Sequence, residues 1–191
     1  MNTVRTFIVY VADHPGVLNR VSSLFRRRGY NIESLTVGHT QIAGVSRMTV
    51  VVGIDALGAP LVRANLHKLA EVLHVEDITG VPSLHRELVI AKVMAGESAR
   101  PDLMRVVTAF EARVLEVGDE WLVIESTGPE EAIESLLEGI RPYGILEMTR
   151  TGCVAMTRGK SPVFTPSKSS AAGSVPLWNR EEGINIARNC S

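Results

Sequence analysis

The chain has 191 residues, 45% of them hydrophobic, which is enough for one large domain or two small domains with a sizeable apolar core. Its formal net charge of −1 argues against a surface that binds nucleic acid or an anionic membrane. It contains no apolar run long enough to span a membrane, no recognisable signal peptide and only two distant cysteines, Cys153 and Cys190, so we expect a cytoplasmic protein without disulfides.

The first half of the chain predicts the order strand, helix, strand, strand, helix, strand. Residues 6–12 are apolar and rich in β-branched side chains, as in a buried strand. The segment 17–28 carries apolar residues at the spacing of one helix face, and the segment that begins at Pro60 repeats this spacing as far as Leu73. The remaining strands are expected at residues 32–38, 45–54 and 75–81.

The second half repeats the same order after a boundary at Pro82-Ser83. A helix is expected at residues 101–110, where a proline stands at the start. We expect a second helix to start near Pro129, because two glutamates follow this proline and acidic residues are favoured in the first turn of a helix. Its apolar face contains Ile133, Leu136, Leu137 and Ile140. Strands are expected at residues 85–95, 114–117, 121–126 and 145–156.

Two βαββαβ units in series define an α+β fold of two ferredoxin-like domains in tandem. We place an N-terminal domain at residues 1–81, a C-terminal domain at 82–160 and a flexible tail, rich in Ser, Pro and Gly, at 161–191. Each unit should form an antiparallel sheet with two helices on one face. Because the free face must be covered and the edge strands must be paired, this arrangement predicts a homodimer.

The segment from Asp13 to Leu18 joins the first expected strand to the first helix. Pro15 and Gly16 permit a sharp turn that leaves the first N–H groups of the helix free to bind an anion such as a carboxylate. Asp13, next to His14, could accept a hydrogen bond from an ammonium group, so the segment suits a free α-amino acid. An ordinary turn explains the same residues, and spacing alone favours that interpretation.

Longer motifs carry a resemblance to a known family. Pro15-Gly16-Val17-Leu18 leads into the first expected helix, and Gly29-Tyr30-Asn31-Ile32-Glu33-Ser34-Leu35 follows that helix. Together these motifs resemble the ACT domain of the acetolactate synthase (acetohydroxyacid synthase) small, regulatory subunit. The resemblance extends over about residues 3–160, with further matches at Ser46-Arg47-Met48-Thr49-Val50, Leu66-His67-Lys68-Leu69, His85-Arg86-Glu87-Leu88 and Arg150-Thr151-Gly152.

The resemblance implies a non-catalytic subunit that activates a large catalytic subunit and makes it sensitive to L-valine. The large subunit of this family carries thiamine diphosphate, Mg²⁺ and usually FAD, and the small subunit has no cofactor of its own. Two ACT domains would join their sheets edge to edge, with the amino acid at the interface. The implied valine-binding residues are Asp13, His14, Pro15, Gly16, Val17, Leu18, Asn31 and Ile32.

Within this implied site, the valine carboxylate would meet the backbone N–H groups of residues 16–18. Asp13 and Asn31 would hold the ammonium group, with Asn31 reaching across from the partner chain, and Ile32 would join an apolar wall with the side chains of 17 and 18. Many family members carry Asn where this chain has Asp13. A carboxylate there suits an ammonium group but would repel the ligand carboxylate unless the two are well separated.

The sequence offers little support for other kinds of site. The histidines are scattered and no Cys-x-x-Cys occurs, which argues against a dedicated zinc site. There is no Gly-x-Ser-x-Gly motif and no phosphate-binding loop, so we expect no catalytic site in this chain. The rival interpretation is a freestanding ACT-domain sensor that regulates transcription or an unrelated enzyme.

Overall fold

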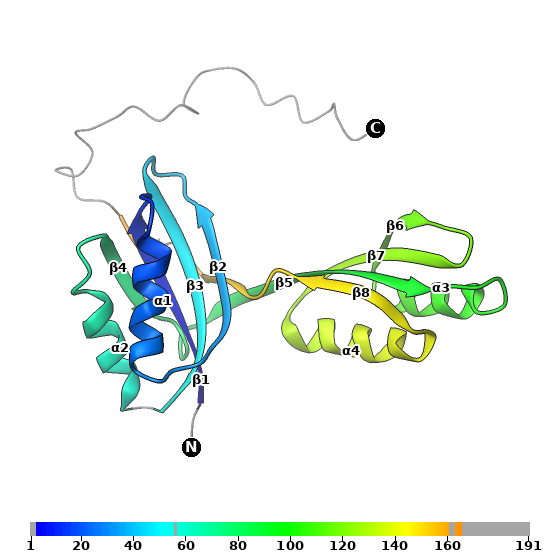
Figure 1. Ribbon diagram of the computed structural model, residues 1–191, viewed down its shortest axis with the longest axis horizontal. Coiled ribbons are helices and arrows are strands. Elements are labelled where there is room, and N and C mark those ends of the chain that lie inside the picture. The colour runs from blue at the N-terminus through cyan, green and yellow to red at the C-terminus, as the bar shows by residue number, and fades with distance from the viewer. Residues whose placement is uncertain (1–2, 56, 161–162, 166–191) are drawn as a thin grey trace.

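The computed structural model describes residues 3–55, 57–160 and 163–165. Two antiparallel sheets each carry two helices on one face, which confirms the α+β prediction (Figure 1). The tail predicted at 161–191 lies outside the described residues except for 163–165, and so does Cys190. None of the helices in the described ranges has the length and apolarity needed to cross a membrane.

The first sheet has the strand order β2-β3-β1-β4, and two helices cover one of its faces (Figure 1). Its elements are β1 (Thr3–Ala12), α1 (Val17–Arg27), β2 (Ile32–His39), β3 (Val45–Ile54), α2 (Gly58–Leu66) and β4 (Val72–Asp77). Phe7, Val9 and Val11 alternate along β1 and are at most 1% exposed, because they pack against the helices. The core of this half therefore lies between the sheet and the helix layer.

The end of α2 differs from the prediction. α2 ends at Leu66 and β4 begins at Val72, whereas the apolar spacing predicts one helix as far as Leu73. Leu69 continues the spacing because it packs onto the core from the connecting turn. Val72 pairs with Val11 of β1 and therefore belongs to the sheet. The predicted boundary is wrong because packing from a turn can imitate a helix face.

The second sheet has the strand order β6-β7-β5-β8, again with two helices on one face (Figure 1). Its elements are β5 (Ser83–Met94), α3 (Arg100–Ala109), β6 (Arg113–Val117), β7 (Trp121–Gly128), α4 (Glu130–Ile140), a short 3-10 helix (Arg141–Tyr143), β8 (Ile145–Arg150) and β9 (Val154–Thr157). The buried core between this sheet and its helices includes the predicted apolar face of α4, which consists of Ile133, Leu136, Leu137 and Ile140.

The last predicted strand, at residues 145–156, is interrupted in the structure. β8 ends at Arg150 and β9 begins at Val154, and Gly152 between them has a φ of 78°. Residues with a Cβ rarely adopt this conformation. β8 pairs with residues 89–93 of β5, whereas β9 pairs with residues 83–86 of β5, off the path β6-β7-β5-β8. The prediction of one continuous strand is therefore wrong.

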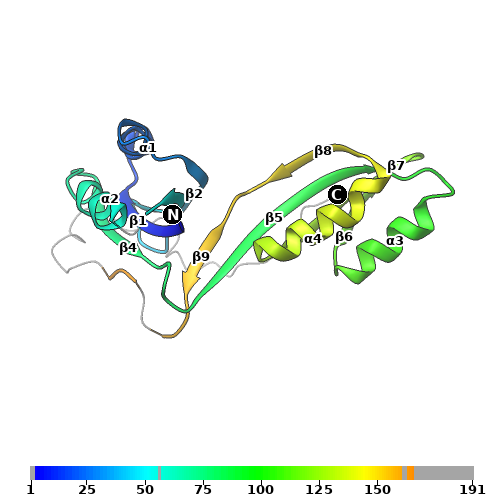
Figure 2. The same ribbon diagram turned by 90° about the horizontal axis from the view of Figure 1, so that it is seen from below.

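β9 returns the chain to the first domain. β5 has 12 residues and extends from the second sheet toward the first, with β9 beside it (Figure 2). Ala155 of β9 is 1% exposed and packs with Ile8 of β1 and Ile78. Because Ile8 alternates with residues that face the helices, β9 covers part of the sheet face that the helices leave free. A two-stranded ribbon and a small apolar cluster therefore connect the two domains.

Candidate functional site

Backbone groups at the start of α1 form the first part of the candidate site. Gly16 has a φ of 86° and a ψ of −7° and precedes the first helical residue, Val17. Within the described part of the chain, the N–H groups of Gly16, Leu18 and Asn19 have no backbone acceptor. The positive end of the helix dipole adds to these free donors, so the turn can bind an anion.

The turn is held in place from the side of the sheet and the core. The Asp13 N–H donates to Gly44 O at 2.8 Å, which ties the turn to the β2–β3 hairpin. Val17 is 5% exposed and its side chain packs in the core, so it presents backbone rather than side chain to the surface. The exposed residues of the segment are Asp13, His14, Pro15, Gly16 and Leu18.

A histidine to which the sequence analysis assigns no role lies beside the turn. His39 ends β2, and its Nδ1 lies 3.3 Å from Oδ2 of Asp13. The two side chains are 86% and 46% exposed, so the pair contributes little to folding stability. A protonated His39 would nevertheless offset the negative charge of Asp13 next to the anion-binding turn. No spacing in the sequence signals this contact, because strand pairing brings the end of β2 to the turn.

Asn31 and Ile32 lie at the other end of α1 and do not approach the turn within one chain. α1 has 11 residues, which corresponds to a length of about 16 Å. Asn31 is exposed just before β2, and Ile32 is half-buried against the core. A single chain therefore presents the predicted site as two separated halves.

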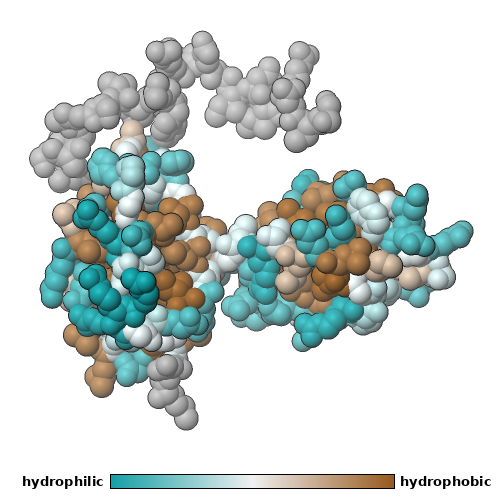
Figure 3. Space-filling model, viewed as in Figure 1, coloured by the Kyte–Doolittle hydropathy of each residue, from teal (hydrophilic) through white to brown (hydrophobic). Residues whose placement is uncertain are grey.

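The two halves lie at opposite ends of one edge strand. β2 runs from Ile32, next to Asn31, to His39, next to Asp13, and it is the outer strand of the first sheet. Among the described strands, only β3 pairs with it, so its outer edge is open. Val37 of β2 is 46% exposed, and Figure 3 shows apolar side chains gathered on this side of the domain. An open edge with apolar side chains is typical of a strand that pairs with another chain.

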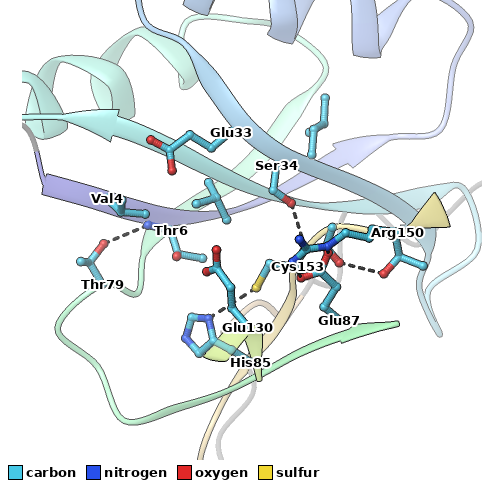
Figure 4. A pocket seen from close by; sticks show the side chains of 14 residues that line it. Val4, Thr6, Glu33, Ser34, Thr79, His85, Glu87, Glu130, Arg150 and Cys153 are labelled. Carbon is cyan, nitrogen blue, oxygen red and sulfur yellow. Dashed lines mark hydrogen bonds and ion pairs between the residues drawn. The ribbon is translucent and has the colours of Figure 1, made fainter. Parts of the chain in front are cut away.

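A second cluster of polar side chains lines a cavity of about 670 Å³ between the two domains (Figure 4). Arg150 donates to both carboxylate oxygens of Glu87, at 2.7 and 2.8 Å, and these hydrogen bonds raise the pKa of Arg150. Cys153 Sγ lies 3.5 Å from His85 Nδ1. Burial raises the pKa of the Cys153 thiol, and the carboxylates of Glu87 and Glu130 raise it further. A protonated thiol is a poor nucleophile, so burial disfavours a nucleophilic role for Cys153.

Comparison with known proteins assigns both halves of the chain to one family. Residues 7–74 match the family described as the AHAS small subunit-like ACT domain, and residues 86–159 match the small subunit of acetolactate synthase. The acetolactate synthase small subunit of Bacillus subtilis is 40% identical over 166 residues, which cover 86% of this chain and 96% of that protein. The small subunit of Mycolicibacterium smegmatis is 43% identical over 154 residues, which cover 81% of this chain and 91% of that protein.

The fold agrees with these matches. The crystal structure of the acetolactate synthase small subunit from Thermotoga maritima aligns with a TM-score of 0.76 and 30% identity, over 83% of this chain and 99% of that one. In the described residues, no three His, Cys, Asp or Glu side chains gather as metal ligands would. The family resemblance of the motifs is confirmed: this chain belongs to the family of acetolactate synthase small subunits, and its N-terminal half is an ACT domain.

Proposed function

We propose that this chain is the regulatory subunit that activates the large catalytic subunit of acetolactate synthase and makes it sensitive to L-valine. The observation that supports the proposal most directly is the divided site, with free backbone donors at Gly16 near one end of β2 and Asn31 at the other. Family membership supports the large subunit as the partner. In this proposal residues 1–81 bind the amino acid and 82–160 form a second domain that responds to it.

A two-fold pairing of β2 strands would complete the site. When two copies of one strand pair antiparallel, the beginning of each lies beside the end of the other. β2 has 8 residues and is about 27 Å long, so Asn31 of the partner subunit would reach the turn at Gly16, beside His39. The same pairing supplies hydrogen-bond partners for the open edge. We therefore expect the homodimer interface along β2, with one amino-acid site at each end.

Each composite site offers a suitable group to every part of L-valine. The carboxylate accepts hydrogen bonds from the free backbone N–H groups of Gly16 and Leu18, whereas the Val17 N–H already donates to His14 O. The ammonium group lies between Asp13 and the partner's Asn31. Leu18, which is 46% exposed, contacts the isopropyl group together with the partner's Ile32. A protonated His39, 3.3 Å from Asp13, would limit the repulsion between the two carboxylates.

Regulation then requires a difference between two arrangements of the complex. The catalytic cofactors thiamine diphosphate, Mg²⁺ and FAD would belong to the large subunit, and this chain would act on that enzyme through protein contacts. Valine changes the activity only if it binds one arrangement more tightly than the other. A site shared by two chains is sensitive to the relative orientation of those chains, so a site at the β2 interface is suited to regulation.

The test is reconstitution of the complex from separately purified large and small subunits. We expect the two chains to co-purify, acetolactate formation to increase on mixing, and valine to reverse this increase. A chain that neither binds nor activates the large subunit would instead favour the freestanding sensor.

Gly16→Asp tests the position of the site. It places a carboxylate where the ligand carboxylate should bind, so activation should remain while valine inhibition is lost. Gly16→Ala is the matched control, because it introduces a Cβ at the same φ of 86° without the charge, and this Cβ meets no atom within 4 Å. A Gly16→Asp complex as sensitive to valine as the wild type would mean that the site lies elsewhere.

A further inference from the structure

The segment that follows β8 is bound to β2 through its backbone. We call residues 151–157, the turn after β8 together with β9, the strap. The Cys153 N–H donates to Ser34 Oγ at 2.8 Å (Figure 4). The Thr36 hydroxyl donates to Cys153 O at 2.9 Å. Ser34 and Thr36 alternate with residues that face the helices, so both point to the free face of the sheet. Two side chains of β2 therefore hold a single residue of the strap.

Further contacts fix the strap on the ACT domain. Arg47 of β3 donates a hydrogen bond to Ala155 O. Ala155 itself is 1% exposed within the apolar cluster on the free face. A Cβ at Gly152 would lie 2.4 Å from Ser34 Oγ, so the backbone of the strap is in direct contact with β2. The strap cannot keep these contacts and move independently of β2.

At its other end, the strap is continuous with an ion-pair network of the C-terminal domain. Arg150, the last residue of β8, donates to Glu87 of β5 and also to Glu134 of α4. Glu87 is 8% exposed, so the Arg150–Glu87 pair is largely shielded from water, whereas the Glu134 side chain is 47% exposed. The Thr151 N–H donates to Leu88 O at 3.0 Å. The beginning of the strap is therefore tied to β5 and α4 as well as to β2.

We propose that Ser34 and Thr36 are positioning residues that transmit occupancy of the amino-acid site to the C-terminal domain through the strap. This inference rests on the proposed function, since it assigns a route to the regulation of the same site. The two halves of that site lie at the ends of β2, and Ser34 and Thr36 lie between them. A displacement of β2 on ligand binding moves Cys153, and with it Arg150 and the elements that Arg150 holds.

The experiment separates valine binding from the response to it. The double variant Ser34→Ala, Thr36→Val removes both hydroxyl groups with little change in shape. Thr149→Val is the matched control, because Thr149 is exposed on β8 outside the strap. Two lost hydrogen bonds of ordinary strength should reduce the coupling between valine binding and inhibition about 10- to 30-fold. The valine Kd of the small subunit alone, measured by calorimetry, should stay within about twofold of the wild-type value.

Amide hydrogen exchange measures the strap itself. In the wild type, valine should change the exchange rates of residues 151–157 although they lie on the opposite face from α1. In the double variant, these residues should exchange faster without ligand and should no longer respond to valine. Gly152→Ala, which pushes the strap away from Ser34, should cause the same loss of response by a different physical route.

The possible failures are distinguishable. A double variant that binds valine and is inhibited as strongly as the wild type would overturn the role of the strap and leave the proposed function intact. Equal changes in amide exchange on valine binding in the wild type and the double variant would also overturn the role of the strap and leave the proposed function intact. A wild-type small subunit that binds no valine would overturn the proposed function, and the transmission route with it.

Discussion

Mixed dimers provide the most direct test of a site divided between two chains. One chain carries Asn31→Ala and the other carries Gly16→Asp. If each site takes its turn from one chain and its asparagine from the other, both sites are damaged in either homodimer. The heterodimer contains one doubly damaged site and one site built from wild-type residues only. The intact site should bind valine with the wild-type affinity, although neither homodimer has a site of this affinity.

The dimensions of α1 set the expected size of the effect. The helix separates Asn31 from Gly16 by about 16 Å within one chain, which is longer than an amino acid, so Asn31 can serve only the turn of its partner. A hydrogen bond to a charged group contributes about 1.5–3 kcal/mol, so Asn31→Ala should weaken valine binding about 10- to 100-fold. In Gly16→Asp, like-charge repulsion at the carboxylate position should abolish measurable binding.

The assay is isothermal titration of heterodimers purified through a different affinity tag on each chain. We expect about one valine per dimer with the wild-type Kd, against two per wild-type dimer. The two homodimers, carried through the same exchange procedure, are the controls. A heterodimer that retains both tags but recovers no wild-type site would show that Asn31 does not act across the interface.

Three other perturbations address stability and domain structure. Glu87→Gln breaks a largely buried ion pair and should lower the free energy of unfolding by about 2–4 kcal/mol and Tm by about 5–10 °C. Asp102→Asn, in an exposed ion pair, is the control and should shift Tm by less than about 2 °C. Equal shifts in Tm would contradict the argument from burial. Burial raises the pKa of the Asp77 carboxyl, but hydrogen bonds, chiefly from Thr79, outweigh it and hold this pKa below the usual 3.8. The unfolded state therefore binds more protons, so Tm of the wild type should fall more steeply than that of Asp77→Asn between about pH 5 and pH 3, and parallel curves would refute this. Residues 1–81 alone should dimerise in sedimentation and bind valine in calorimetry, and a folded fragment without valine heat would defeat the proposed division.

Apolar periodicity predicts the order of the elements, but not the segments whose partners are distant in sequence. The spacing predicts a helix at 17–28, and α1 spans Val17–Arg27. The break between β8 and β9 escapes prediction because a strand-like pattern continues through it. The side chains that fix the break, Ser34 and Thr36, lie 119 and 117 positions away from Cys153. Only the folded chain brings them together.

The candidate site also has a part that local sequence predicts and a part that it does not. The Gly16 turn is a local feature, so Pro15 and Gly16 before an amphipathic helix are sufficient to predict free N–H donors. The contact between His39 and Asp13 depends on the pairing of β2 with β3 and leaves no mark in the sequence. The role of Asn31 depends on a second chain, and it came from the family resemblance rather than from spacing.

The shared site also links valine binding to dimerisation. If each site needs the turn of one chain and Asn31 of the other, valine binds the dimer and hardly binds the monomer. Thermodynamic linkage then requires saturating valine to tighten the dimer, for each of its two sites, by the factor by which dimerisation improves valine binding. With two sites and free valine at about ten times Kd, the dimer dissociation constant should fall about 100-fold. Sedimentation across a dilution series, with valine and with D-valine as the control, measures this shift. A dissociation constant that does not respond to L-valine would mean that the site is complete within one chain, and the pairing of β2 would then have no part in ligand recognition.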